Sequence, residues 1–234
     1  ESVLRGVSHH GDLAGTQVLI SAGGTREPID AVRFVGNRSS GRMAWALAAA
    51  ARDRGAAVTV VPANVDLPRE QGITYFDAPT AAEMREVCRA QFSGTDMLIM
   101  CAAVADYHPV DQRAGKLDKS AADSLTVQME RTTDILAELS ALRDEQVLVG
   151  FAAEHGPEGL ERARAKRVRK AVDMVVHNDA AVDGAAFEGP DNIITIIGPG
   201  DAELALPRMS KRQCADAILD AVLPLVSGGA PVTA

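Results

Sequence analysis

Short apolar runs and longer amphipathic segments alternate along most of this chain. The apolar runs have polar or turn-forming neighbours, which predicts buried strands at residues 17–21, 58–62, 73–77, 97–102, 147–151 and 174–177. Apolar residues recur at helical spacing at 43–54, 80–92, 133–142, 158–170 and 210–226. Gly55 can end the first of these helices, and Thr80 with Glu83 predicts a capping box at the start of the second.

This alternation predicts an α/β fold, a Rossmann-like three-layer sandwich with a mainly parallel sheet covered on both faces. A further strand is expected around 125–129, and residues 192–197 and 203–206 predict an edge hairpin that turns through Gly198-Pro-Gly-Asp. The chain of 234 residues is long enough for one substantial core. We expect a single domain at 15–228, with 1–14 as a linker remnant and 229–234 as a tail.

Composition and charge exclude several classes of protein. No apolar run approaches the roughly 18 residues of a membrane span, and the chain starts without a signal-peptide pattern, so we expect a soluble cytoplasmic protein without membrane partners. The net charge of −8 argues against nucleic acid as a partner. Cys88, Cys101 and Cys214 lie far apart, without the spacing of a zinc site or a disulfide framework.

Candidate chemistry lies where the predicted strands end, because open α/β sheets bind ligands beyond the carboxyl ends of their strands. Gly23 and Gly24 follow the first strand and allow close backbone approach. Ser39, Ser40 and Gly41 precede the first helix, where free backbone amides can bind a phosphate. Each feature also has a plain structural interpretation, since glycines turn the chain and serines cap helices.

Charged residues after the later strands extend this candidate site. Asp106 follows the fourth strand and could hold a metal ion that bridges phosphates, or it could cap a turn. Lys116 and Lys119 lie in a polar segment that could cover a triphosphate or simply be solvated. Lys166 and Lys170 are four residues apart on one helix face, which could face phosphates or water.

Four motifs together resemble the phosphopantothenate-cysteine ligase family. They are Gly23-Gly-Thr-Arg-Glu-Pro-Ile-Asp, Val32-Arg-Phe-Val-Gly-Asn-Arg-Ser-Ser-Gly-Arg-Met, Ala102-Ala-Val-Ala-Asp-Tyr and Val149-Gly-Phe-Ala-Ala-Glu. The resemblance implies a ligase that joins 4'-phosphopantothenate and L-cysteine through an acyl-cytidylate formed from CTP, with release of pyrophosphate and with Mg²⁺ or Mn²⁺ present. It also implies a homodimer and, in bacteria, fusion to a flavin-dependent decarboxylase domain.

The resemblance assigns roles to individual residues. Asn37 resembles the asparagine that holds the acyl intermediate, and Arg33 lies in the same substrate loop. Asp106 resembles the residue at the metal ion, and Lys116 the lysine of the flap that covers the triphosphate. The residues that resemble nucleotide contacts are Met100, Cys101, Ala102, Thr132, Thr133, Asp134, Ile135, Phe151, Lys166 and Lys170. Thr132-Thr-Asp-Ile departs from the family pattern Asn-Pro-Asp-Ile.

Two other functions fit the fold class, an NAD(P)-dependent oxidoreductase and a non-catalytic nucleotide-binding module. The spacing Gly-x-Gly-x-x-Gly is absent, and the second strand ends in Val61-Pro-Ala-Asn without the acidic residue that binds a ribose hydroxyl. Both observations argue against the oxidoreductase. Neither the strand order nor these residues explain a choice of CTP over ATP.

Overall fold

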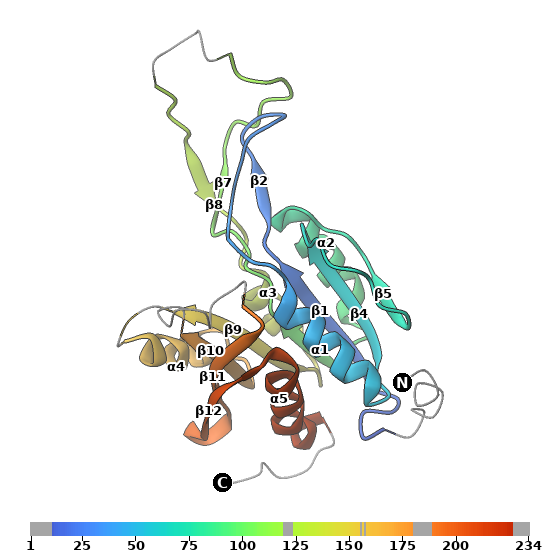
Figure 1. The fold of residues 1–234 in the computed structure, drawn as a ribbon. Coiled ribbons are helices and arrows are strands. Elements are labelled where there is room, and N and C mark those ends of the chain that lie inside the picture. Colours follow the sequence, from blue (N-terminus) through green and yellow to red (C-terminus); the bar gives the residue numbers. More distant parts are fainter. Residues whose placement is uncertain (1–10, 119–123, 155, 157, 180–188, 227–234) are drawn as a thin grey trace.

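The computed structural model describes residues 11–118, 124–154, 156, 158–179 and 189–226, and a single large sheet runs through them (Figure 1). Its strands lie in the order β12-β11-β10-β9-β6-β1-β4-β5. They are β1 (Gln17–Gly23), β4 (Ala57–Ala63), β5 (Ile73–Tyr75), β6 (Met97–Met100), β9 (Val147–Glu154), β10 (Met174–Asp179), β11 (Asp191–Ile197) and β12 (Glu203–Ser210). Neighbours from β5 to β10 pair in parallel, whereas β11 and β12 form an antiparallel edge.

Helices cover both faces of this sheet. On one face α1 (Arg42–Asp53) packs beside α5 (Lys211–Val226), and on the other lie α2 (Ala81–Phe92), α3 (Ile135–Leu142) and α4 (Gly159–Arg169). Each face has its own buried apolar cluster, because the central parallel strands are buried on both sides. The predicted Rossmann-like sandwich and its edge hairpin are confirmed, with a short 3₁₀ turn at Pro199–Asp201 between β11 and β12.

The order of the strands creates one place where a ligand can enter. From β1 the chain proceeds outward to β4 and β5, then returns to the other side of β1 as β6. The connections after β1 and β6 therefore diverge to opposite faces and leave a crevice at the carboxyl ends of these strands.

The predicted capping box at the start of α2 is also confirmed. The Thr80 hydroxyl accepts from the Glu83 amide at 3.3 Å, and the Glu83 carboxylate accepts from the Thr80 amide at 3.0 Å.

A narrow projection extends from the sheet beyond the carboxyl ends of β1 and β6 (Figure 1). It contains two short antiparallel pairs, β2 (Arg26–Pro28) with β3 (Phe34–Gly36), and β7 (Tyr107–Pro109) with β8 (Met129–Arg131). We call residues 26–36, 107–118 and 124–131 the arm.

The arm corrects two expectations. The strand predicted at 125–129 is wrong: β8 begins at Met129 and pairs with β7 outside the main sheet. Residues 124–128 form no strand, and Leu125 is exposed rather than packed on an apolar layer. The strands β2, β3 and β7 were not predicted, because their residues are mostly polar or exposed and carry no periodic signal.

The folded body begins earlier than the predicted boundary at residue 15. Leu13 is completely buried, and the guanidinium of Arg54 donates to the carboxylate of Asp12 at 2.8 Å. The segment from residue 11 to 14 therefore belongs to the domain rather than to a linker. The rest of the predicted linker and the predicted tail lie outside the described residues.

Candidate active site

A large cavity of about 860 Å³ lies at the crevice formed by the carboxyl ends of the strands. It is bordered by the loop before α1, the loop after β6, the carboxyl end of β9, the start of α3, the last turn of α4 and the start of α5. Most of the predicted site residues line it together: Asn37, Ser39, Ser40, Gly41, Met100, Cys101, Ala102, Asp106, Thr132, Thr133, Asp134, Ile135, Phe151, Lys166 and Lys170. Residues from segments far apart in the sequence thus face one space.

Hydrogen bonds to buried hydroxyls fix the loop that follows β6. The hydroxyl of Ser21 accepts from the amide of Ala102 at 3.1 Å, and that of Thr25 accepts from the amide of Ala105 at 2.8 Å. Ser21 and Thr25 are fully buried and belong to the end of β1 and the residues after it. The loop that presents Asp106 is therefore held in place before any ligand binds.

Asn37 reaches the same loop from the segment between β3 and α1. Its side-chain amide donates to the carbonyl oxygen of Val104 at 3.1 Å and lies 3.5 Å from that of Ala103. Gly24 makes room for this approach, because a Cβ atom there would lie 2.6 Å from the backbone oxygen of Asn37. One N–H of Asn37 is thus used to orient the side chain, and the other has only the longer contact.

The start of α1 offers backbone donors to the cavity. Gly41 caps the helix with a φ of 75°, a left-handed conformation that favours glycine, and no side chain caps the first turn. The first backbone N–H groups of a helix have no partner within the helix and point outward, where they bind anions well. Ser39 and Ser40 border the same part of the cavity.

Two lysines from the end of α4 form the opposite wall. Lys166 donates from Nζ to the backbone oxygen of Phe151 at 2.6 Å, and burial lowers its pKa. Lys170 forms an ion pair with Asp134, which also caps α3 by accepting from the amide of Ala137 at 3.1 Å. The cations predicted from the helical spacing therefore lie at the cavity, and their positions are fixed by contacts with β9 and α3.

Several lining residues were not predicted, and three of them are polar residues from the far edge of the sheet: Asn178 at the end of β10, Asn192 at the start of β11, and Lys211 at the start of α5. Among the described residues, the side-chain oxygens of both asparagines are buried without a hydrogen-bond partner. Lys211 donates to the backbone oxygens of Gly189 and Asp191 at 2.5 and 3.1 Å, and burial lowers its pKa. A buried amide oxygen without a partner costs stability, so these two oxygens are suited to accept from a bound ligand.

One sequence signal could have revealed part of this set. Asn178 directly follows the predicted strand at 174–177, the position where the other candidates were found. Asn192 carries no such signal, because it stands at the start of β11, which antiparallel pairing with β10 brings to the same edge. Lys211 directly follows β12, whose predicted end at residue 206 was four residues too early.

Cys101 contributes a neutral thiol to the cavity wall. Burial raises its pKa to about 12, and a thiol rather than a thiolate is neither a good nucleophile nor a metal ligand. More broadly, no group of three or more His, Cys, Asp or Glu that could hold a metal ion exists in the described part of the chain. Any metal ion here would depend on ligands from a substrate.

Four predicted residues do not line the cavity: Gly23, Gly24, Arg33 and Lys116. Gly23 is the last residue of β1 and Gly24 follows it. Because Gly24 has no side chain, it leaves room for the backbone of Asn37. Arg33 and Lys116 are both in the arm, where Lys116 is exposed. Lys119 lies outside the described residues.

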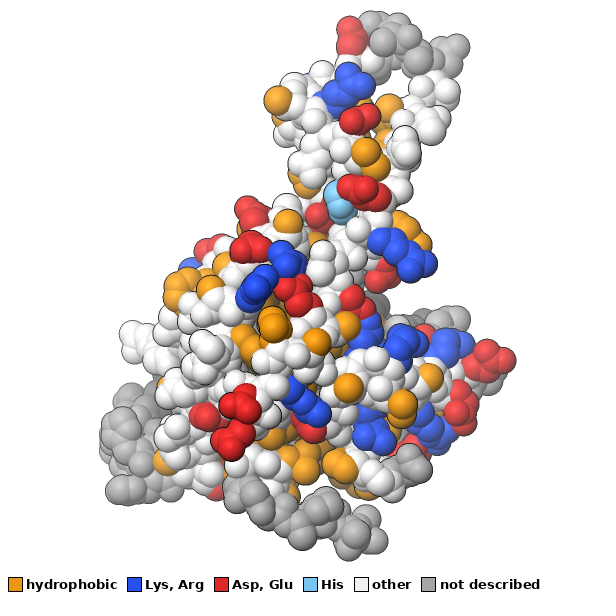
Figure 2. Space-filling view, turned by 180° about the vertical axis from the view of Figure 1, so that it is seen from behind, with side chains coloured by type: hydrophobic (Ala, Val, Ile, Leu, Met, Phe, Trp, Pro, Cys, Tyr) orange, Lys and Arg blue, Asp and Glu red, His pale blue; other side chains and the backbone are white. Residues whose placement is uncertain are grey.

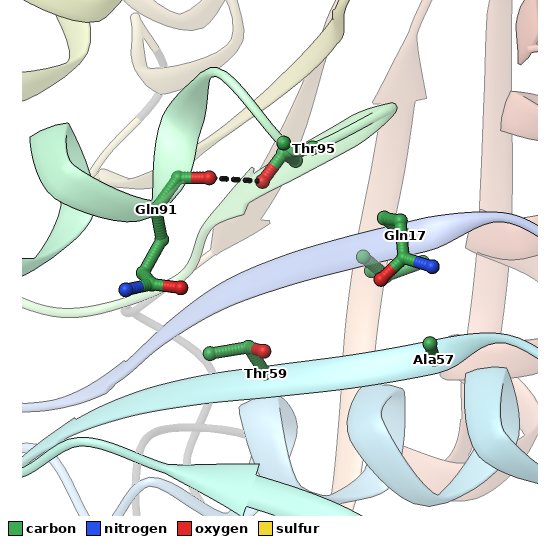
Figure 3. Close-up of a pocket in the computed structure, with 7 residues that line it drawn as sticks. Gln17, Ala57, Thr59, Gln91 and Thr95 are labelled. Atoms are coloured by element: carbon green, nitrogen blue, oxygen red, sulfur yellow. Dashed lines mark hydrogen bonds between the residues drawn. The ribbon is translucent and has the colours of Figure 1, made fainter.

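A second, much smaller hollow lies near the opposite ends of the strands (Figure 3). It measures about 90 Å³ and is lined by Gln17, Val18, Ala57, Thr59, Gln91, Gly94 and Thr95. The Thr95 hydroxyl donates to the backbone oxygen of Gln91 at 3.0 Å, which stabilises the end of α2. No charged side chain is present in this lining, so the large cavity is the candidate active site.

Comparison with known proteins identifies the family. Residues 13–225 match the model of the DNA/pantothenate metabolism flavoprotein C-terminal domain. The chain belongs to this family. The match covers every element from β1 to α5, so the arm and the cavity are parts of the same family domain.

Among relatives, the coenzyme A biosynthesis bifunctional protein CoaBC of Vibrio parahaemolyticus is 43% identical over 216 residues, which cover 92% of this chain and 54% of the relative. This chain therefore spans about half the length of the curated relatives it matches. The crystal structure of the C-terminal domain of a CoaBC protein is 33% identical with a TM-score of 0.80, covering 93% of this chain and 99% of that one.

A structure of a Cab2 mutant in complex with phosphopantothenate-cysteine has a TM-score of 0.74 at 14% identity, covering 97% of this chain and 93% of that one, a likeness of fold alone. No helix among the described residues of this family member is long and apolar enough to cross a membrane.

Proposed function

We propose that this domain is a ligase that joins 4'-phosphopantothenate to L-cysteine, with CTP as the activating nucleotide. Fold similarity alone would not separate a ligase from other enzymes. The observation that carries the proposal is that Asn37, Asp106 and Lys166 face one large cavity in a domain of the pantothenate metabolism family. Among the described residues, no contact favours the oxidoreductase or the non-catalytic module.

The proposed reaction has two steps. A carboxylate oxygen of 4'-phosphopantothenate bonds to the α-phosphorus of CTP, the bond from that phosphorus to the bridging oxygen breaks, and pyrophosphate leaves. The amine of L-cysteine then bonds to the acyl carbon of the acyl-cytidylate, CMP leaves, and the amine loses a proton. The first step gathers several negative charges in one place, so cations and hydrogen-bond donors must offset their repulsion.

The cavity provides such groups on two sides. Lys166 and Lys170 stand on the α4 side, and Lys211 stands on the α5 side beside the start of α1. A triphosphate that spans the cavity would receive positive charge from both walls and backbone N–H groups from α1. Asn37, whose side chain is already oriented by Val104, can give its remaining N–H to an acyl oxygen without adding charge.

Asp106 is the residue that we propose to hold Mg²⁺ or Mn²⁺. Its carboxylate is exposed at the cavity, and Mg²⁺ in nucleotide sites commonly takes one or two carboxylates together with phosphate oxygens and waters. One carboxylate, that of Asp106, thus fits an ion that arrives with the nucleotide. Such an ion supplies charge neutralisation of the phosphates.

A nucleotide panel tests the activation step. Protein with Mg²⁺ and 4'-phosphopantothenate is expected to release pyrophosphate with CTP, and more slowly with ATP, GTP and UTP. Protein without 4'-phosphopantothenate is the control and should release none. Equal rates with all four nucleotides would contradict the choice of CTP, and absence of pyrophosphate with every nucleotide would contradict the ligase.

We further propose that two copies of the domain form a dimer through the arm. Val32, Phe34 and Leu125 are 62%, 51% and 56% exposed there, and the arm has no core of its own that could cover them. Hydrophobic side chains are visible along it in Figure 2. Light scattering should give twice the chain mass of 24.6 kDa, whereas a monomer at all concentrations would contradict the dimer.

In the complete protein we propose that a flavin-dependent decarboxylase domain is fused to this one, because its relatives are bifunctional and about twice as long. We also propose a cytoplasmic location for this enzyme, which cell fractionation would test. Recovery of the enzyme in the membrane fraction would contradict it.

A further inference from the structure

Asp30 lies in the turn between β2 and β3, and its two carboxylate oxygens have different partners. Oδ1 accepts from the backbone N–H groups of Val32 at 2.8 Å and Arg33 at 2.7 Å, the usual way in which aspartate stabilises a turn. Oδ2 instead accepts from the backbone N–H of Leu117 at 3.1 Å. The first oxygen explains the turn, whereas the second joins segments 87 residues apart in the sequence.

Further contacts hold the same two segments together. The guanidinium of Arg33 donates to the backbone oxygen of Leu117 at 3.1 Å, so the N–H and the carbonyl group of Leu117 are both bound. The backbone N–H of Arg113 donates to the oxygen of Ile29 at 3.1 Å. We call these contacts the clasp. They join the two strand pairs of the arm, where β2 contacts β7 (Figure 1).

The environment of Asp30 keeps its carboxylate bound and charged. The residue is 4% exposed, and the backbone N–H of Leu117 is the main cause that holds its pKa below the ordinary value. The guanidinium of Arg33, at 3.5 Å from Oδ2, acts in the same direction. Titration near neutral pH therefore does not open the clasp.

We propose that Asp30 is a positioning residue for Lys116, acting through the peptide of Leu117. This inference rests on the proposed role of Lys116 at the triphosphate. Lys116 directly precedes Leu117, so the clasp fixes the backbone from which its side chain extends. Asn37, seven residues after Asp30, is held by the hydrogen bond from its side-chain amide to the carbonyl oxygen of Val104. The clasp thus sets the position of Lys116, proposed to act on the nucleotide, relative to Asn37, proposed to act on the acyl group.

Asp30→Asn tests this role with little change in shape. One oxygen remains to stabilise the turn, but an NH₂ group replaces the acceptor that faces the N–H of Leu117. We expect pyrophosphate release to become about tenfold slower, the effect of losing one charge-assisted hydrogen bond, with the change in kcat larger than that in the KM for 4'-phosphopantothenate. Asp111→Asn, an exposed change in the same arm, is the matched control and should keep the wild-type rate.

A double-mutant cycle separates positioning from a general structural effect. If Asp30 acts through Lys116, then Asp30→Asn should cost less than about twofold once Lys116 has been replaced by glutamine. The full tenfold loss in that background would overturn the proposal. Thermal unfolding verifies that each variant is folded. If Asp30→Asn does not fold, Asp30→Ser takes its place, because serine keeps one oxygen that can stabilise the turn.

Limited trypsin digestion provides a readout that does not depend on activity. Lys116 is exposed, and cleavage of the bond from Lys116 to Leu117 requires that the clasp open. We expect cleavage to be about tenfold faster in Asp30→Asn than in wild type or Asp111→Asn. Equal rates would overturn the clasp. If wild-type protein released no pyrophosphate, the proposed function would fail while this digestion still tested the clasp.

Discussion

Replacing Asn37 by aspartate is expected to slow formation of the amide product by about 10²- to 10³-fold, the usual cost of removing one donor to a developing oxyanion. The aspartate cannot donate to Val104, whose carbonyl oxygen lies 3.1 Å from the amide nitrogen in the wild type. It would also add negative charge where the acyl oxygen must lie. Rapid-quench kinetics with excess CTP would measure the loss separately for activation and amide formation.

Nucleotide affinity is the internal control for this variant, because Asn37 is not among the residues proposed to bind CTP. Asn64→Asp is the matched external control: Asn64 donates to the backbone oxygens of Gly24 and Pro79, both at 2.9 Å, and does not line the cavity. It should lower the free energy of unfolding by about 1 kcal/mol or more and leave the acyl step intact. Wild-type turnover by Asn37→Asp would show that its role is wrongly assigned.

Replacing Lys116 by glutamine is expected to slow pyrophosphate release by about 10²-fold, because a cation that offsets charge on the leaving group is lost while side-chain length is kept. The loss should lie in kcat of the activation step. Hydrolysis of isolated acyl-cytidylate should be unaffected, since the pyrophosphate has already left. Stopped-flow detection of pyrophosphate would measure the first quantity and mass spectrometry the second.

Arg113→Gln is the matched control for this prediction. Arg113 is exposed on the same segment, three residues before Lys116, and only its backbone N–H takes part in the clasp. Removal of its charge should therefore leave the rate of pyrophosphate release near that of wild type. An equal loss in both variants would mean that the arm acts through its overall charge, and an unchanged rate in Lys116→Gln would remove the flap assignment.

The sequence predicted the sheet well, because parallel strands that are buried on both faces appear as short continuous apolar runs. It could not predict the arm, since β2, β3 and β7 are stabilised by pairing and by side-chain contacts such as that of Arg26 with the ring of Phe34 at 4.6 Å. Local sequence carries no signal for such pairing. The strand expected at 125–129 is the opposite error: only Met129 of that segment belongs to a strand, and it pairs with β7 outside the main sheet.

The candidate site was predictable where a residue lies shortly after the carboxyl end of a parallel strand, as Asp106 does after β6. Asn192 was not predicted because the antiparallel edge brings the beginning of β11, and not its end, to the cavity. Lys211 was not predicted because β12 ends at Ser210, four residues beyond the predicted end at 206. Arg33 and Lys116 were predicted from family resemblance to lie in the site, yet they meet each other in the arm through Leu117. That neighbourhood depends on tertiary contacts, which spacing along the chain does not encode.

The central claim is that this domain forms an amide between 4'-phosphopantothenate and L-cysteine. Mass spectrometry of a reaction with Mg²⁺, CTP, 4'-phosphopantothenate and ¹⁵N-labelled L-cysteine tests it most directly. We expect 4'-phosphopantothenoylcysteine that retains the label, with CMP and pyrophosphate formed in equal amounts. Folded protein that yields no labelled amide, or that yields CDP and phosphate in place of CMP and pyrophosphate, would contradict it.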